Sequence, residues 1–142
     1  MARRADEYLK HLSKVPMFRA LSKRDLQLVK RLAEDHEIAG GDDLVKQGSR
    51  GHEFFIIVSG KATVRRNGKK IGTLGPGDYF GELALLDPAP RNATVTADQP
   101  MEVLILNDRE FSGLLAEVPT LSRKILTGMA RRLHEADSKI VY

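Results

Sequence analysis

Apolar residues recur at helical spacing near the N-terminal end of the chain. The sequence predicts two helices within residues 1–36. Val15-Pro16 separates them, because the residue before a proline is disfavoured in helical conformation. Ser22, followed three positions later by Asp25, is the pattern that opens a helix. The two apolar faces consist of Ala5, Tyr8, Leu9 and Leu12, and of Leu26, Val29, Leu32 and Ala33.

The last quarter of the chain, residues 108–142, returns to helical spacing. Asn107 and Glu110 predict the cap of a short helix, and Pro119 suits the first turn of the next one. Gly128 falls inside this second helix, where glycine costs about 1 kcal/mol relative to alanine. It therefore marks either close packing or a hinge. The apolar stripe of the last helix consists of Leu121, Ile125, Met129, Leu133, Ala136 and Ile140.

Between these ends, in residues 37–107, the apolar residues no longer recur at helical spacing. Glycine and proline recur at short intervals, and short apolar or alternating runs lie between them. This pattern is typical of an all-β barrel or jelly roll. Asn67-Gly68 predicts a two-residue hairpin, because both residue types tolerate positive φ. The expected strands cover residues 44–46, 54–58, 62–65, 71–74, 94–97 and 103–106.

Composition narrows the function classes. The chain has 142 residues, the size of one domain. It contains no cysteine, which excludes disulfides, thiolate metal sites and thiol nucleophiles. No apolar run approaches the roughly 20 residues of a membrane helix. The basic start is not followed by the apolar stretch of a secretory signal. We therefore expect a cytoplasmic protein with no membrane span.

The formal net charge is +4; residues 1–36 carry nine basic and five acidic side chains, whereas residues 37–107 carry eight and nine and are near neutral. Binding of nucleic acid would require lysines and arginines gathered on one element. The basic pairs are instead scattered through the sequence, so we expect most of them to lie on solvated surfaces. They are Arg3-Arg4, Arg65-Arg66, Lys69-Lys70 and Arg131-Arg132.

One segment, residues 75–94, does not have the pattern of the strands that form the predicted barrel. Good helix formers at positions 82–86 are bounded by Gly81 and Pro88, which allows a short helical turn. A helix N-terminus favours an anion, and Gly81 lets a ligand approach the backbone. Arg91 can hold a phosphate through two parallel hydrogen bonds, and Glu82 can accept from sugar hydroxyls. Together these groups predict binding of the sugar-phosphate of a nucleotide.

The string Phe-Gly-Glu-Leu-Ala-Leu-Leu at residues 80–86, followed by Pro-Arg-Asn-Ala-Thr at 90–94, resembles the phosphate-binding cassette of cyclic nucleotide-binding domains. Such domains occur in the catabolite activator protein, in protein kinase A regulatory subunits and in cyclic-nucleotide-gated channels. The glycine-spaced segment 48–60 and the turn at 15–18 agree with the same family. The resemblance implies an α+β fold: an eight-stranded antiparallel β-roll (a double-stranded β-helix or jelly roll) with flanking N- and C-terminal helices, forming one domain over residues 1–142.

The resemblance also implies residue roles. Glu82 is expected to bind the ribose 2′-hydroxyl, and Arg91 the cyclic phosphate. Arg132 lies where some relatives place a purine-contacting arginine, and Asn92 follows the phosphate arginine. Family members that prefer cGMP often carry Thr or Ser at that position, so we expect cAMP as the ligand, with cGMP as the alternative. The expected backbone contacts come from Gly81, Leu83, Ala84 and Ala93.

These expectations describe a regulatory binding module and not an enzyme. The helix from about Thr120 to Lys139 is expected to move when the ligand binds. The alternative is that its stripe packs on the roll, or pairs with a second copy or a partner domain. His52 replaces an acidic residue of many relatives, which we expect to be a surface change without effect on binding.

Two other classes are weighed against this one. A cupin-type metalloenzyme needs clustered histidines, yet residues 37–107 contain only His52, so we expect no metal and no cofactor. A regulator of the catabolite activator type reads DNA with a helix-turn-helix beyond the last helix. The sequence stops at Tyr142, so no nucleic acid binding is expected of this chain alone. It would act as a free receptor or as the ligand-sensing part of a larger kinase, channel, transporter or transcription regulator.

Overall fold

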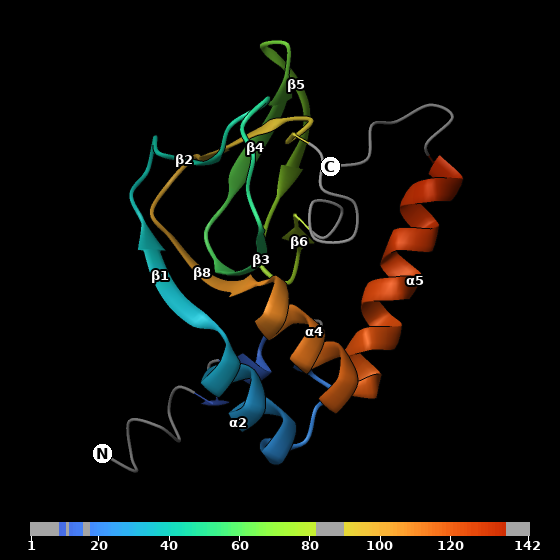
Figure 1. Cartoon of the computed structure of the whole chain (residues 1–142). Helices are drawn as coiled ribbons and strands as arrows, with labels where there is room; N and C mark the ends of the chain where they lie inside the picture. The colour runs from blue at the N-terminus through green and yellow to red at the C-terminus, as the bar shows by residue number, and fades with distance from the viewer. Residues whose placement is uncertain (1–8, 11, 16–17, 82–89, 136–142) are drawn as a thin grey trace.

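The computed structural model of the chain describes residues 9–10, 12–15, 18–81 and 90–135, with the backbone alone for residues 129 and 132–135. In this part of the chain, eight antiparallel strands form two four-stranded sheets that enclose a roll, and helices lie at its base and along one side (Figure 1). This arrangement confirms the predicted α+β fold with an eight-stranded antiparallel β-roll.

The two sheets interleave strands from distant parts of the sequence. The first has the order β1 (Glu34–Ile38), β8 (Met101–Asn107), β3 (Glu53–Ser59) and β6 (Tyr79–Phe80). The second has the order β2 (Asp43–Val45), β7 (Thr94–Ala97), β4 (Ala62–Arg66) and β5 (Lys69–Leu74). The chain crosses from one sheet to the other several times, as expected of a jelly roll.

Strand β3 separates two hydrophobic cores. Successive side chains of a strand point to opposite faces. Phe54, Ile56 and Val58 pack with the helices in one core, whereas Phe55 and Ile57 pack inside the roll in the other. Five consecutive residues of β3 are therefore buried, and the continuous apolar run at 54–58 reflects burial on both faces.

The helices at the base are α2 (Lys23–Leu32) and α4 (Asp108–Glu117), and α5 (Pro119–Glu135) runs from there along the side of the roll (Figure 1). Their predicted caps are confirmed. The Ser22 side chain accepts from the backbone N–H of Asp25, and Asn107 and Glu110 form a reciprocal capping box. The caps fix the residues at which α2 and α4 begin. Helix α4 then contacts strands β8 and β3 of the roll and the helix α5.

The predicted hairpin is also confirmed. Asn67 and Gly68 adopt φ angles of 52° and 79°, and they join β4 to β5 in an antiparallel pair. Two positive φ values in sequence are the mark of a type I′ turn, which matches the twist of the flanking strands.

The structure departs from the sequence prediction at two short strands. Residues 34–36 were expected in the helical zone, but α2 ends at Leu32 and β1 begins at Glu34. Strand β1 is mostly exposed and polar, so it lacks the alternation of apolar and polar residues by which a strand is predicted. It forms because it pairs with β8. The two-residue strand β6 was not expected; it exists because it pairs with β3.

Candidate functional site

The site is centred on Arg91, which lies in the loop before β7. A pair of backbone hydrogen bonds fixes this loop against the loop that follows β2. The Arg91 N–H donates to the Ser49 carbonyl, and the Gly48 N–H donates to the Arg91 carbonyl, both at 2.8 Å. The backbone of Arg91 is thereby held at a defined depth beside residues 48–51.

The Arg91 side chain is buried, with 8% of its surface exposed. Its Nη2 donates to the Glu53 carbonyl at 2.9 Å, and its Nη1 lies 3.5 Å from the Gly81 carbonyl. A guanidinium remains charged at any physiological pH, and burying it is costly unless its N–H groups find acceptors. The two carbonyls orient the guanidinium within the site.

Two glycines make room for this guanidinium. A Cβ atom on Gly51 would lie 2.9 Å from Nη2 of Arg91. A Cβ atom on Gly81 would lie 2.5 Å from the Glu53 carbonyl oxygen and 2.9 Å from Nη1 of Arg91. Gly81 also has a φ of +94°, which L-residues with side chains rarely adopt. Glycine at both positions is thus a requirement of the buried arginine.

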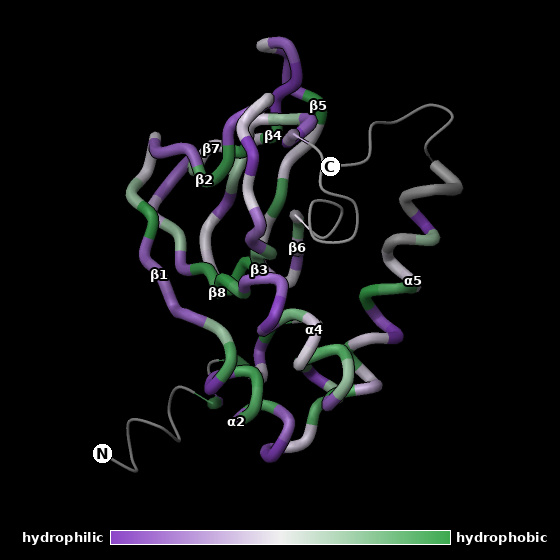
Figure 2. Tube along the Cα trace, in the orientation of Figure 1, coloured by the Kyte–Doolittle hydropathy of each residue, from purple (hydrophilic) through white to green (hydrophobic). Residues whose placement is uncertain are grey.

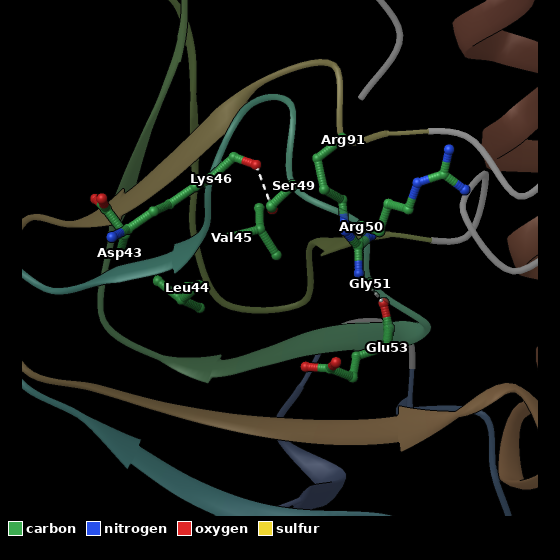
Figure 3. Close-up of a pocket in the computed structure, with 9 residues that line it drawn as sticks. All are labelled: Asp43, Leu44, Val45, Lys46, Ser49, Arg50, Gly51, Glu53 and Arg91. Atoms are coloured by element: carbon green, nitrogen blue, oxygen red, sulfur yellow. Dashed lines mark hydrogen bonds between the residues drawn. The ribbon is translucent and has the colours of Figure 1, made fainter.

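A pocket of about 250 Å³ opens beside Arg91. Figure 3 shows Arg91 reaching past Gly51 toward the Glu53 carbonyl, whereas the side chain of the exposed Arg50 extends away from that point. Lys46 also lines the pocket. The exposed acidic residues Asp43 and Glu53 line the opening as well, so it is the buried Arg91, and not the net charge of the lining, that makes the pocket suited to an anionic group.

Beyond Arg91, the site meets the apolar interior of the roll. Ala93 is buried in this core, and the rings of Phe55 and Phe80 stack with centroids 4.6 Å apart. Phe55 is therefore core, as the sequence indicated. Asn92, which lies between the buried Arg91 and Ala93, is half-buried. The buried cation thus lies two residues from the apolar core of the roll.

The structure brings together three of the predicted site residues. The Gly81 carbonyl lies 3.5 Å from Nη1 of Arg91, and Ala93, two positions after Arg91, is buried in the core of the roll. Glu82, Leu83 and Ala84 lie outside the described residues, and so does the predicted short helical turn. Arg132 belongs to α5, of which only the backbone is described at that position.

Sequence reasoning missed two contributors, Gly51 and the backbone carbonyl of Glu53. The segment from Gly48 to Gly51 did stand out as a glycine-spaced loop, and that spacing was the available signal for Gly51. No signal existed for the carbonyl of Glu53, because every residue carries one, and only the folded chain shows which carbonyl faces the arginine.

A second relationship links this site to α5. Tyr79, two positions before Gly81, is buried, and its hydroxyl donates to the Ile125 carbonyl at 3.0 Å. Gly128 faces the same hydroxyl, and a Cβ atom there would overlap it. Gly128 therefore marks close packing, one of its two expected roles. Leu121 and Ile125 are fully buried, whereas Leu126 is 61% exposed, so the first turns of α5 belong to the core.

Metal sites and membrane-spanning helices are two further features that bear on function. No group of three or more histidine, aspartate and glutamate side chains in the described part of the chain could hold a metal ion. None of the described helices combines the length and the apolar character that crossing a membrane requires.

Comparison with known proteins places this geometry in context. A family model described as "Cyclic nucleotide-binding domain" matches residues 35–118. The chain is 43% identical to a cAMP-dependent protein kinase regulatory subunit of Mycosarcoma maydis, with 80% of the chain and 23% of that protein covered. It is 30% identical to a cGMP-dependent protein kinase of Toxoplasma gondii, with 92% of the chain and 13% of that protein covered.

Among solved structures, the chain is similar to a PKAR CBD2 bound to Sp-2Cl-cAMPS. The TM-score is 0.77 at 29% identity, and the match covers 98% of this chain and 95% of that one. The chain thus spans a quarter or less of the curated relatives that it matches, but nearly the whole of this single solved domain.

Proposed function

Because this chain belongs to the cyclic nucleotide-binding domain family, we propose that it binds cAMP and reports the binding through its C-terminal helix. The chain is a ligand-binding regulatory domain and not an enzyme. Its proposed activity requires only differential binding to two conformations, because a ligand shifts an equilibrium by its difference in affinity for the two states.

The buried Arg91 carries this proposal. Its guanidinium is oriented by the carbonyls of Glu53 and Gly81, and two glycines are adapted to it. A planar, preoriented cation suits an anion with two acceptor oxygens, such as the cyclic phosphate of a cyclic nucleotide. The roll interior behind Ala93 supplies the apolar surroundings that strengthen this attraction.

The remaining contacts follow the family pattern. Glu82 would accept from the ribose 2′-hydroxyl, and the backbone N–H groups of Leu83, Ala84 and Ala93 would complete the phosphate cradle. Gly81 would allow the close approach of the ligand to the backbone. Arg132 would contact the purine when the C-terminal helix closes over it.

Preference for cAMP over cGMP rests on two arguments. The position after the phosphate arginine carries Asn92, and not the threonine or serine that often accompanies cGMP binding. The relative with 43% identity is named for cAMP, although another relative is named for cGMP. A cGMP-preferring receptor is the alternative.

The proposed route to the C-terminal helix runs through Tyr79. This residue lies in β6, directly before the cassette, and its hydroxyl donates to the backbone of α5. A ligand that shifts the cassette would shift β6 and alter the Tyr79–Ile125 bond. The second half of α5 would then close over the ligand. As an alternative, this half pairs with a second copy or with another domain.

The chain's small share of its curated relatives supports a place in a longer regulator. We propose that the domain gates a partner activity, as in a kinase regulatory subunit, with a channel, a transporter or a transcription regulator as alternatives. A cytoplasmic location suits an intracellular nucleotide ligand.

Titration calorimetry with cAMP, cGMP and 5′-AMP in parallel tests the proposal. We expect cAMP to bind at least about tenfold more tightly than cGMP, a difference of about 1.4 kcal/mol. The open-chain 5′-AMP, with its extra charge and different phosphate geometry, should bind most weakly. A cGMP affinity equal to that of cAMP would overturn the selectivity, and absence of binding by both cyclic nucleotides would overturn the function.

A further inference from the structure

The β4–β5 hairpin gathers basic residues that look scattered in the sequence. Arg65 and Arg66 end β4, Lys69 and Lys70 begin β5, and the Asn67-Gly68 turn joins them. We call these four basic residues the basic tip. Of the eight lysines and arginines in residues 37–107, half are in the basic tip. These residues lie at the surface, as expected, but the hairpin brings the pairs Arg65-Arg66 and Lys69-Lys70 together.

The register of the hairpin places like charges opposite each other. Arg65 faces Lys70, and Arg66 faces Lys69. Like charges at directly opposed positions of an antiparallel pair are destabilising. Within the described part of the chain, no carboxylate lies within ion-pair distance of any of the four. The fold thus keeps an unfavourable arrangement that four neutral residues would avoid.

The hairpin is held firmly despite this repulsion. The Gln47 side chain donates to Oδ1 of Asn67 at 2.9 Å and accepts from the Asn67 backbone N–H at 2.8 Å. The backbone N–H of Gln47 in turn donates to the Thr94 hydroxyl at 2.9 Å. Gln47 and, through it, Thr94 therefore fix the turn, so the backbone that carries the four cations is already ordered before a partner binds.

A structural role explains only part of the basic tip. Strand β5 is an edge strand of its sheet, and edge lysines discourage pairing with other chains. This accounts for Lys69 and Lys70. It does not account for Arg65, which pairs with Lys70 on one side and with Thr94 of β7 on the other and so lies in the interior of the sheet. Arg66 lies beyond the last pair between β4 and β7.

We propose that the basic tip is a docking site for an acidic polypeptide segment, independent of the nucleotide site. Consecutive residues of a strand point to opposite faces, so the ribbon presents one arginine and one lysine on each face. A flexible chain can reach both faces at once. Its aspartates and glutamates would pair with the two arginines through parallel hydrogen bonds.

A membrane fits this tip less well. The turn consists of Asn67 and Gly68, so it offers no apolar or aromatic side chain to the bilayer interface. A flat anionic surface would also meet the ribbon only at its end. Figure 2 shows the end of the hairpin beyond the β5 label as largely hydrophilic.

A nucleic acid also fits less well. Proteins that bind duplexes strongly make about 6–10 phosphate contacts, and a duplex would extend beyond the four cations of the tip. The rest of the roll would repel it, because residues 37–107 carry nine acidic and eight basic side chains in total. A short acidic segment avoids this repulsion by contacting the tip alone.

Fluorescence anisotropy with a labelled deca-glutamate peptide tests the proposal. The wild-type chain should bind the peptide, and its affinity should fall as salt rises, because exposed charges are screened beyond about 10 Å at 0.1 M salt. Neutralising the tip with Arg65→Gln, Arg66→Gln, Lys69→Gln and Lys70→Gln should lower the affinity at least about tenfold. The affinity for cAMP should stay unchanged, which separates this test from that of the nucleotide site.

A matched control removes the same amount of charge from the opposite end of the molecule. It carries Lys14→Gln, Arg19→Gln, Arg24→Gln and Arg31→Gln, all at exposed positions. This control should retain peptide affinity within about twofold, the scale of isolated surface charges. An equal loss in both variants would overturn the proposal, because net charge alone would then explain binding.

A charge reversal protects the test from a folding artefact. Lys69→Glu with Lys70→Glu places opposite charges across the ribbon, so its melting temperature should equal or exceed that of the wild type. The same variant should lose the peptide. Retained peptide binding would overturn the proposal, and so would tip-dependent binding of duplex DNA or phosphatidylserine vesicles without binding of the peptide.

Discussion

The hydroxyl of Tyr79 lies between two residues of α5, donating to the Ile125 carbonyl at 3.0 Å and facing the bare Cα of Gly128. This contact joins the strand that leads into the nucleotide cassette to the helix that is proposed to respond. It is also closely packed, because any side chain at position 128 would occupy the space of the hydroxyl.

Gly128→Ala should therefore destabilise the protein. Alanine would improve the helix by about 1 kcal/mol, but overpacking typically costs about 1–3 kcal/mol. We expect a net decrease in the free energy of unfolding, measured from urea titration. In a Tyr79→Phe background the overlapping oxygen is gone, so the same substitution should cost less. A Gly128→Ala protein that is more stable than the wild type would contradict the observed packing.

Tyr79→Phe should uncouple the helix from the cassette. It removes one hydrogen bond to a buried carbonyl, which is worth about 1 kcal/mol of stability. Hydrogen exchange of residues 119–135 should slow on cAMP binding in the wild type and change much less in the variant. Because the substitution leaves in place the Glu53 and Gly81 carbonyls that orient Arg91, cAMP affinity should fall only modestly. Equal protection of α5 in both proteins would show that the signal takes another route.

Gly51→Ala should weaken cyclic nucleotide binding without unfolding the domain. The new Cβ would lie 2.9 Å from Nη2 of Arg91, which forces the guanidinium from its present position. Disturbing one charge-assisted hydrogen bond should cost about 1–2 kcal/mol of binding free energy. Gly75→Ala is the matched control, because a Cβ atom there meets nothing within 4 Å. Calorimetry should show a loss for Gly51→Ala only, and equal affinities would count against the role of Gly51.

Glu82→Ala should discriminate between ribose and deoxyribose ligands. If Glu82 accepts from the 2′-hydroxyl, its removal should weaken cAMP binding by about 1–3 kcal/mol, the cost of leaving a buried polar group unpaired. Binding of 2′-deoxy-cAMP should weaken less, because that ligand lacks the hydroxyl. The comparison uses four titrations, two proteins against two ligands. An equal loss for both ligands would indicate that Glu82 only caps its helix.

Local signals predicted the local structure well. The Asn67-Gly68 turn and the Asn107–Glu110 capping box depend on residues a few positions apart, and both are present. Strand β1 could not be predicted in the same way. It is a polar, exposed strand, and its pairing of Glu34 with Ile105 joins positions 71 residues apart, a relationship that no local pattern contains.

The same distinction holds for the site. Arg91 was identifiable because its residue type and its place in the cassette both point to a phosphate. The acceptors that orient it are backbone atoms, which the residue names Glu53 and Gly81 do not announce. The sequence left Gly128 as either a close-packing position or a hinge, and the contact with Tyr79 in the folded chain identifies close packing. The sequence alone does not show which distant residues lie next to each other in the fold.

Arg91→Ala, measured by calorimetry with cAMP, tests the central claim most directly. The variant leaves the cyclic phosphate without its cation, so cAMP binding should weaken by about 2–5 kcal/mol. Arg50→Ala provides the control, because Arg50 lines the same pocket but is exposed and extends away from Arg91 (Figure 3). We predict a large loss for Arg91→Ala and little change for Arg50→Ala, with both proteins folded. Wild-type affinity in the folded Arg91→Ala protein would contradict the account.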